Sequence, residues 1–203
     1  MTNFEELPEL TAEQLAAMSE SERVAYEELR QMGPAERVRF LGQVKVVAAA
    51  EKFLASVCDR QDLRTVWPRV DPVLRLCSAQ QWIVDNARSF NAEGYDRDDV
   101  AAALANEQPD HPLWQHFERV HVRSISGIVP ASAVRGIGTH TRMIAPDVEM
   151  LYVHDQTGRE GSAWQPGEER FVFPIAMRWD GEDWLVASLG SESLPVPGWP
   201  PTF

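Results

Sequence analysis

The chain is short of the residues on which many functional assignments depend. Its two cysteines, Cys58 and Cys77, form no CxxC motif, so neither a zinc site nor a thioredoxin-like redox pair is predicted. No apolar run approaches the roughly 18 residues that a membrane-spanning helix needs. The opening MTNFEELPEL has neither the basic nor the apolar region of a secretory signal. We therefore expect a soluble, cytoplasmic protein with reduced thiols, no metal, no cofactor and no membrane contact.

Positive charge is also scarce, with 19 Lys and Arg against 31 Asp and Glu, a net charge of −12. Nucleic-acid binding needs a basic stripe that releases counterions, and the arginines here are scattered. Nucleic acid is therefore not an expected partner. Residues 1–30 contain eight glutamates and only two arginines. Such a segment is typical of a solvated helical face, or alternatively docks on a basic protein partner.

Helix signals dominate the first half of the chain. Gly33-Pro34 separates two helical patterns, because proline is tolerated at the first position of a helix. We divide the chain there into an acidic helical arm, residues 1–33, and an α+β domain, residues 34–203. Helices are predicted at 11–32, 34–58, 71–86 and 98–105. Two capping boxes support the arm, Thr11 with Gln14 and Ser19 with Glu22.

Beyond about Leu113 the pattern changes to the period of two that is typical of strands. The strongest signal is Asp180-Gly181 between two apolar runs, which predicts a β-hairpin. Pro174 in the first run indicates a sheet edge or a bulge, and the proline-rich tail is expected to cover the body in an extended form. Helices followed by antiparallel strands predict the α+β class. The predicted strands lie at 120–129, 137–144, 150–154 and on both sides of the hairpin turn, within 170–189.

Two segments resemble the nuclear transport factor 2-like superfamily, the ketosteroid isomerase or polyketide cyclase type. VVAAAEKFLASVCDRQDLRTVWPRV (46–70) is similar to its long first helix and the turn that follows, and RWDGEDWLVASL (178–189) to its last two strands. The resemblance implies a curved antiparallel sheet closed by helices into a cone with an interior pocket. That superfamily includes isomerases, dehydratases, cyclases and epoxide hydrolases, but also non-catalytic binding and dimerisation modules. The fold therefore does not choose the function.

Isomerase chemistry in such a pocket needs a carboxylate base and a hydrogen-bond donor. Tyr152 is the one tyrosine in a predicted strand, and Glu149 lies near it. The odd spacing places the two on opposite sheet faces, so they are not expected to cooperate.

Dehydratase chemistry would use a histidine as acid and base. His121 and His140 lie on predicted strands, each two residues before an arginine, Arg123 and Arg142. If these faces line the cone, the pocket is cationic and suits an anionic or carbonyl-bearing ligand. If they face outward, they form a solvated polar face over a core of the alternate apolar residues, which is the simpler interpretation.

Seven tryptophans are an unusual number for a chain of this length. Trp82, Trp114 and Trp179 are candidates for pocket walls, although core or dimer contacts would also explain them. The histidines at 111, 116 and 121 recur every fifth residue, about 140° apart on a helix, and so would not form a metal site. There is no glycine-rich phosphate loop after a strand, and no Gly-x-Ser-x-Gly motif of a hydrolase.

Two functions follow as hypotheses. The favoured one is a non-catalytic small-ligand-binding or assembly module, with an apolar pocket or a homodimer through the sheet. The alternative is a lyase or isomerase acting on a carbonyl-bearing or polycyclic molecule, with His121 or His140 as acid and base and Tyr152 or Trp82 shaping the pocket. Two titratable side chains meeting inside a pocket would favour the enzyme.

Overall fold

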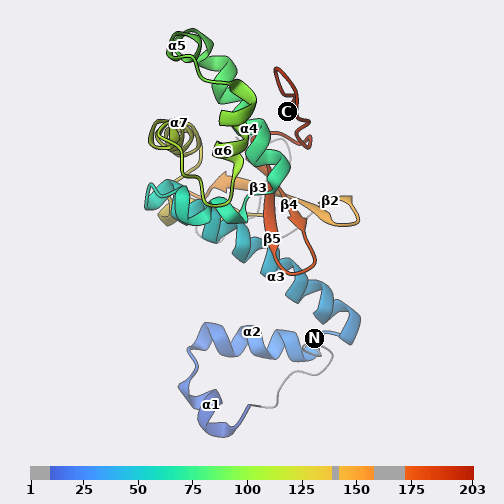
Figure 1. Cartoon of the computed structure of the whole chain (residues 1–203). Coiled ribbons are helices and arrows are strands. Elements are labelled where there is room, and N and C mark those ends of the chain that lie inside the picture. Colours follow the sequence, from blue (N-terminus) through green and yellow to red (C-terminus); the bar gives the residue numbers. More distant parts are fainter. Residues whose placement is uncertain (1–9, 139–141, 158–171) are drawn as a thin grey trace. The chain divides into compact units, whose positions relative to one another are not determined.

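The computed structural model of the chain describes residues 10–138, 142–157 and 172–203 (Figure 1). The chain divides into two compact units, Met1–Lys45 and Val46–Phe203. The boundary between them falls within helix α3, Pro34–Leu54. The division at residue 33 stays a prediction.

The first unit contains α1 (Ala12–Ala17), α2 (Glu20–Gln31) and the start of α3. Both capping boxes form as predicted. At the second, the backbone N–H of Ser19 donates to Glu22 Oε2 at 2.7 Å, which satisfies a donor that the helix itself leaves unpaired. Most described side chains of α2 are exposed, as expected for an acidic helical arm.

The second unit begins with the end of α3, which closes in a π-helical turn, Ala55–Asp59. A 3₁₀ helix and four α-helices follow, and a second, shorter 3₁₀ helix, Ser132–Val134, precedes the sheet. Asp71 starts the first of these α-helices because its carboxylate accepts the backbone N–H of Val73 at 2.8 Å. The bounds are Arg64–Arg69 for the 3₁₀ helix, Pro72–Asp85 for α4, Ala87–Glu93 for α5, Arg97–Ala105 for α6 and Trp114–Ser126 for α7.

An antiparallel sheet follows, so the α+β class is confirmed. The order is β1-β3-β4-β5, and β2 also pairs with β3. The predicted hairpin is present, with Trp179 opposite Trp184 and Gly181 at a positive φ of 109°. The strands are β1 (Arg135–Ile137), β2 (Arg142–Ala145), β3 (Val148–Asp155), β4 (Val172–Trp179) and β5 (Trp184–Leu189).

Pro174 does not mark a sheet edge, because β4 lies between β3 and β5. The Pro174 carbonyl accepts the N–H of Gly190 at 2.9 Å, just beyond the end of β5. In a strand, the nitrogen and the carbonyl of one residue point to the same neighbouring strand. The nitrogen of Pro174, which has no hydrogen to donate, therefore points toward β5 at the place where the pairing of β4 with β5 ends. The bulge that was the other expectation occurs nearby, as a register shift between Ala176 and Met177.

The strand predicted at 120–129 is wrong. Residues 114–126 form α7, in which Trp114, Phe117 and Val122 are buried at the spacing of a helix face. The alternation of apolar Val120 and Val122 with polar residues is compatible with a strand. The apolar spacing over the whole segment from Trp114 is that of a helix, and the helix is the structure that forms. The strand predicted at 137–144 is split, since β1 ends at Ile137 and β2 begins at Arg142, and the residues between lie largely outside the described part. Helix α5 was not predicted.

The main core lies where the helices pack on one face of the sheet. Leu151 and Ile175 come from that face, and Trp67 and Phe117 from the helical side. The Trp67 ring meets Phe117 edge-on, with 5.5 Å between ring centroids. Its indole N–H donates to the Leu104 carbonyl at 3.0 Å, which satisfies a buried polar group.

The proline-rich tail contacts the helices, as predicted for a cover. The N–H of Gly198 donates to Gln80 on α4, and the indole of Trp199 donates to Asp98 on α6. It is not fully extended, however, because Val196 and Thr202 pair with each other.

Candidate functional site

Three hollows in the part of the second unit that the structure describes are bordered by α7 or by the residue before it. One of them, called the aromatic pocket below, has a volume of about 80 Å³ and lies between the α4–α5 junction and the start of α7. Its walls combine aromatic and apolar side chains with polar groups. The residues are Trp82, Asn86, Ser89, Phe90, Glu93, Leu113 and His116.

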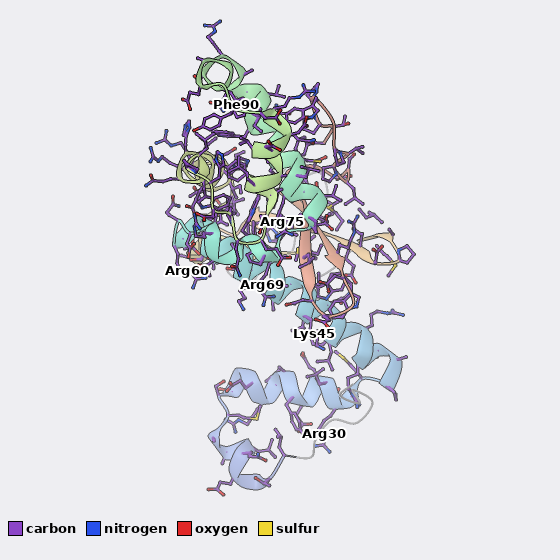
Figure 2. The ribbon with its side chains drawn as sticks, in the orientation of Figure 1. Arg30, Lys45, Arg60, Arg69, Arg75 and Phe90 are labelled. Atoms are coloured by element: carbon purple, nitrogen blue, oxygen red, sulfur yellow. The ribbon has the colours of Figure 1, made fainter. Side chains whose placement is uncertain are left out.

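The chain builds this pocket by a sharp change of direction. The side-chain amide of Asn86 donates to the Trp82 carbonyl at 2.8 Å and ends α4, and α5 starts at the next residue. Trp82 then faces α7, where its ring meets His116 at 5.5 Å and an interplanar angle of 82°. Phe90, on α5 and labelled in Figure 2, also lines the pocket.

The indole nitrogen of Trp82 is buried and has no hydrogen-bond partner among the described residues. The indole nitrogen of Trp114 is likewise buried without a partner there, whereas Trp67 and Trp199 both find an acceptor. Of the two indoles without an acceptor, Trp82 is the one that lines the aromatic pocket. A buried donor without an acceptor costs about 1–3 kcal/mol. A ligand acceptor that reached this nitrogen would recover that free energy.

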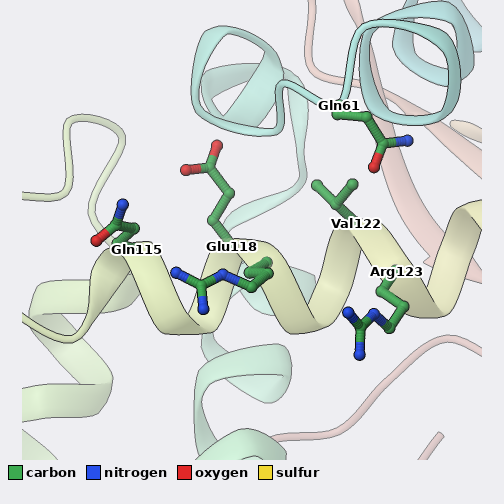
Figure 3. Close-up of a pocket in the computed structure, with 6 residues that line it drawn as sticks. Gln61, Gln115, Glu118, Val122 and Arg123 are labelled. Carbon is green, nitrogen blue, oxygen red and sulfur yellow. The ribbon is translucent and has the colours of Figure 1, made fainter.

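Two arginines occupy the outer face of α7. Arg119 and Arg123 border a groove of about 300 Å³ on one side, shown in Figure 3 with Gln61 facing Val122 across it. They also border a hollow of about 500 Å³ that includes His116 and Val120, called the outer hollow below. Neither guanidinium forms an ion pair or hydrogen bond with the residues that the structure describes. They are available to an anion.

Gln61, which lines the groove, lies just after the π-helical turn Ala55–Asp59. Its backbone adopts a positive φ of 58°, which is uncommon outside glycine. The Gln61 amide donates to the Cys58 carbonyl at 2.7 Å and so closes the end of that turn. Glu118, also in the groove, accepts the backbone N–H of Arg64 at 2.9 Å. The acid in the groove thus already has a partner.

His121 does not lie on a strand, and it does not pair with Arg123 on one face. Residues two apart on a helix diverge by about 200°, so Arg123 is exposed while His121 packs on Phe117 with 4.0 Å between ring centroids. Its Nδ1 lies 2.9 Å from the Phe117 carbonyl, and because a carbonyl only accepts, Nδ1 carries the proton. Burial lowers the pKa of His121, outweighing the Phe117 carbonyl and the charge of Asp85. Packing on Phe117 thus favours the neutral form of His121.

This environment predicts a loss of stability on mild acidification. The unfolded chain binds the His121 proton more readily than the folded one, so the contribution is complete above the ordinary pKa near 6.5 and is lost as the pH falls through the lowered folded pKa. The slope is at most about 1.4 kcal/mol per pH unit. Urea denaturation between pH 7.5 and 5.5 should show a smaller decline for His121→Phe than for the wild type. Equal declines would contradict the assignment.

Glu149 and Tyr152 point to opposite faces of β3, as the spacing indicated. The Tyr152 hydroxyl donates to Glu192 at 3.0 Å. Glu149 is opposite Met177 on β4, and its Oε2 is buried without a hydrogen-bond partner among the described residues. The two do not form an acid and donor pair.

The remaining predicted site residues are dispersed. Trp114 is buried beside Phe117, with 5.2 Å between ring centroids. Trp179 is exposed at the hairpin and contacts Trp184. His140 lies outside the described residues, as does the side chain of Arg142. Trp82 and Arg123 are therefore the predicted pocket residues that border hollows, and the contribution of His116 was missed because residue spacing alone does not reveal which helices meet.

A buried guanidinium and a half-buried thiol are not among the described residues that line the hollows named above. Arg75 lies in the interior (Figure 2), with Nη2 3.4 Å from Glu107 Oε1 and with Nε and Nη1 unpartnered in the described part of the chain. Burial raises the pKa of the Cys58 thiol to about 11, so this cysteine stays protonated at neutral pH.

No three or more His, Cys, Asp or Glu side chains gather into a possible metal site within the described ranges. None of the helices described there combines the length and the apolar character that a bilayer crossing requires.

Comparison with known proteins found no matching family model, no matching curated protein and no matching solved structure.

Proposed function

We propose that this chain is a non-catalytic small-ligand-binding module whose site is the aromatic pocket. The observation that carries the proposal is the buried indole N–H of Trp82, a residue that lines a hollow and whose N–H has no acceptor among the described residues. A ligand carbonyl placed there would restore the missing hydrogen bond. Trp82, Phe90 and Leu113 would hold an apolar group against it by excluding water.

The size of the pocket limits what enters. A volume of about 80 Å³ is below the roughly 300–1,000 Å³ of pockets that enclose whole drug-sized ligands. The pocket therefore suits one end of a ligand, such as a methyl ketone. Because the Trp82 nitrogen is covered in the unliganded chain, the ligand reaches it by displacing the exposed His116 ring, which packs edge-on against the indole.

Heptan-2-one is a suitable probe of this site. We expect it to shift the indole ¹H–¹⁵N resonance of Trp82, identified by its absence in Trp82→Phe, with a dissociation constant on the order of 1 mM. Trp82→Phe should weaken binding about tenfold, because it keeps an aromatic wall but removes the donor.

Trp179→Phe is the matched control, since Trp179 lies exposed at the hairpin, and it should bind as the wild type does. No shift at the Trp82 indole, or unchanged binding by Trp82→Phe, would refute the proposed site.

The proposal extends to assembly and to the fold. A homodimer through the sheet is supported by β2, where Met143 is 65% exposed, and a protein partner for the arm by the exposed glutamates of α2.

The nuclear transport factor 2-like cone remains part of the proposal, supported by the buried apolar face that β3 and β4 turn toward the helices. Cytoplasmic localisation is proposed on the reduced cysteines.

The alternative is a lyase or isomerase acting on a carbonyl-bearing or polycyclic molecule, and Glu149 favours it. Its buried Oε2, which has no hydrogen-bond partner among the described residues, would serve as the base. A base of this kind would speed exchange of the protons beside the ketone of heptan-2-one into D₂O. As a binding module, the protein should leave this exchange, followed by ¹H NMR, at the buffer rate. Acceleration that Glu149→Gln abolishes would establish the enzyme instead.

A further inference from the structure

We propose that the ligand of this module is anionic: its carbonyl end enters the aromatic pocket, and its anionic end binds Arg119 and Arg123 in the outer hollow. This rests on the proposed function and names the class of ligand, an oxo acid or a similar molecule with an acceptor and an anion at opposite ends.

The aromatic pocket and the outer hollow are adjacent. His116 lines both of them, and the path continues along α7 past Val120, which is 41% exposed. A ligand that leaves the aromatic pocket beside His116 therefore passes an apolar side chain before it reaches the arginines. An aliphatic spacer suits that path.

Helix geometry sets the length of the spacer. With a rise of 1.5 Å per residue, Arg119 lies about 4.5 Å and Arg123 about 10.5 Å beyond His116 along the axis of α7. The three positions lie within about 60° of one another around the helix. A chain of about four methylenes between the carbonyl and the anion places the anion between the levels of Arg119 and Arg123, where the long side chains of both reach it.

The charges of the two arginines are not neutralised within the described residues. Other arginines of this unit do have carboxylate partners: Arg69 pairs with Asp183, Arg178 with Asp71, and Arg135 with Glu51. Since acids outnumber bases by 31 to 19, two neighbouring arginines without a carboxylate are not explained by a lack of acids. Guanidinium groups in this arrangement suit a carboxylate or a phosphate, which they bind through paired N–H donors.

The acids near the site fix the direction of the ligand. Glu93 borders the aromatic pocket and repels an anion there, so the anionic end points out along α7. Glu118 belongs to the groove on the other side of α7, where it accepts the Arg64 backbone N–H. The outer hollow, as far as its described lining shows, contains His116, Arg119 and Arg123 but no acid.

The test compares heptan-2-one with 6-oxoheptanoate, which has the same length and the same methyl ketone but ends in a carboxylate. We expect 6-oxoheptanoate to bind at least about tenfold more tightly at low ionic strength, with the gain shrinking as salt is added. Arg119→Gln/Arg123→Gln should lose this gain while binding heptan-2-one as the wild type does. Arg23→Gln/Arg39→Gln, which removes two exposed arginines of the first unit, should keep the gain and controls for net charge.

Equal affinity for the two probes in the wild type would overturn the inference, as would a gain that survives in Arg119→Gln/Arg123→Gln. If heptan-2-one still shifts the Trp82 indole in either case, the proposed pocket stands without an anion site. If neither probe shifts it, the proposed pocket and the inference both fail.

Discussion

Phe117→Ala is expected to destabilise the protein by about 3–5 kcal/mol. Phe117 is completely buried and is the point where several aromatic groups meet. Its ring centroid lies 5.2 Å from that of Trp114, 5.5 Å from Trp67 and 6.0 Å from Trp82. Truncation removes these contacts and leaves a cavity between rigid rings that cannot collapse to fill it. Urea denaturation followed by circular dichroism measures the change.

The matched control is Val120→Ala on the same helix, which should change the free energy of unfolding by less than about 0.5 kcal/mol because Val120 faces outward. Phe117→Ala should also weaken heptan-2-one binding, since the cavity frees the Trp82 ring that forms the wall of the aromatic pocket. A loss below about 1 kcal/mol would show that Phe117 is not central to the core.

Arg135→Met is the second substitution expected to have a large effect, about 2–4 kcal/mol. The Arg135 side chain is completely buried and joins three parts of the unit. Its guanidinium donates to both carboxylate oxygens of Glu51 at 2.6 and 3.0 Å, to Asp59 at 3.1 Å and to the Pro130 carbonyl at 3.0 Å. Removing it leaves two neighbouring carboxylates without their cation.

The expected loss of stability for Arg135→Met is smaller than the largest losses for fully buried ion pairs. The reason is that the Glu51 side chain is 42% exposed, so water partly replaces the arginine. In a double-mutant cycle with Glu51→Gln, measured by urea denaturation, the two losses should not add, because both remove one interaction. Arg88→Met, an exposed position on α5, is the control. Additive losses in the cycle would mean that the pair contributes little.

Local chemistry explains why much of the fold could be predicted. The capping boxes at Thr11 and Ser19 and the hairpin at Asp180-Gly181 depend on residues within a few positions of one another. The prediction failed at α7 because the alternation of Val120 with Val122 is compatible with both a strand and a helix. Packing of Phe117 and Trp114 against Trp67 decides in favour of the helix.

The candidate site was only partly predictable for a related reason. The chemistry of an indole and of a guanidinium was enough to select Trp82 and Arg123 as candidate binding residues, and both border hollows. The assignment of His121 to an acid–base role depended on a strand that does not exist. His116 was passed over because its contact with Trp82 joins helices far apart in the sequence.

The sequence by itself determined the α+β class, the start of the helical arm and the closing hairpin, because caps, turns and apolar periodicity act over short distances along the chain. Only the tertiary structure decided that, among the described residues, Trp82 has no acceptor and Arg119 and Arg123 have no carboxylate partner, and that His116 connects their hollows. The satisfaction of a polar group depends on which distant residues pack around it, and a pattern of residues along the chain does not contain that information.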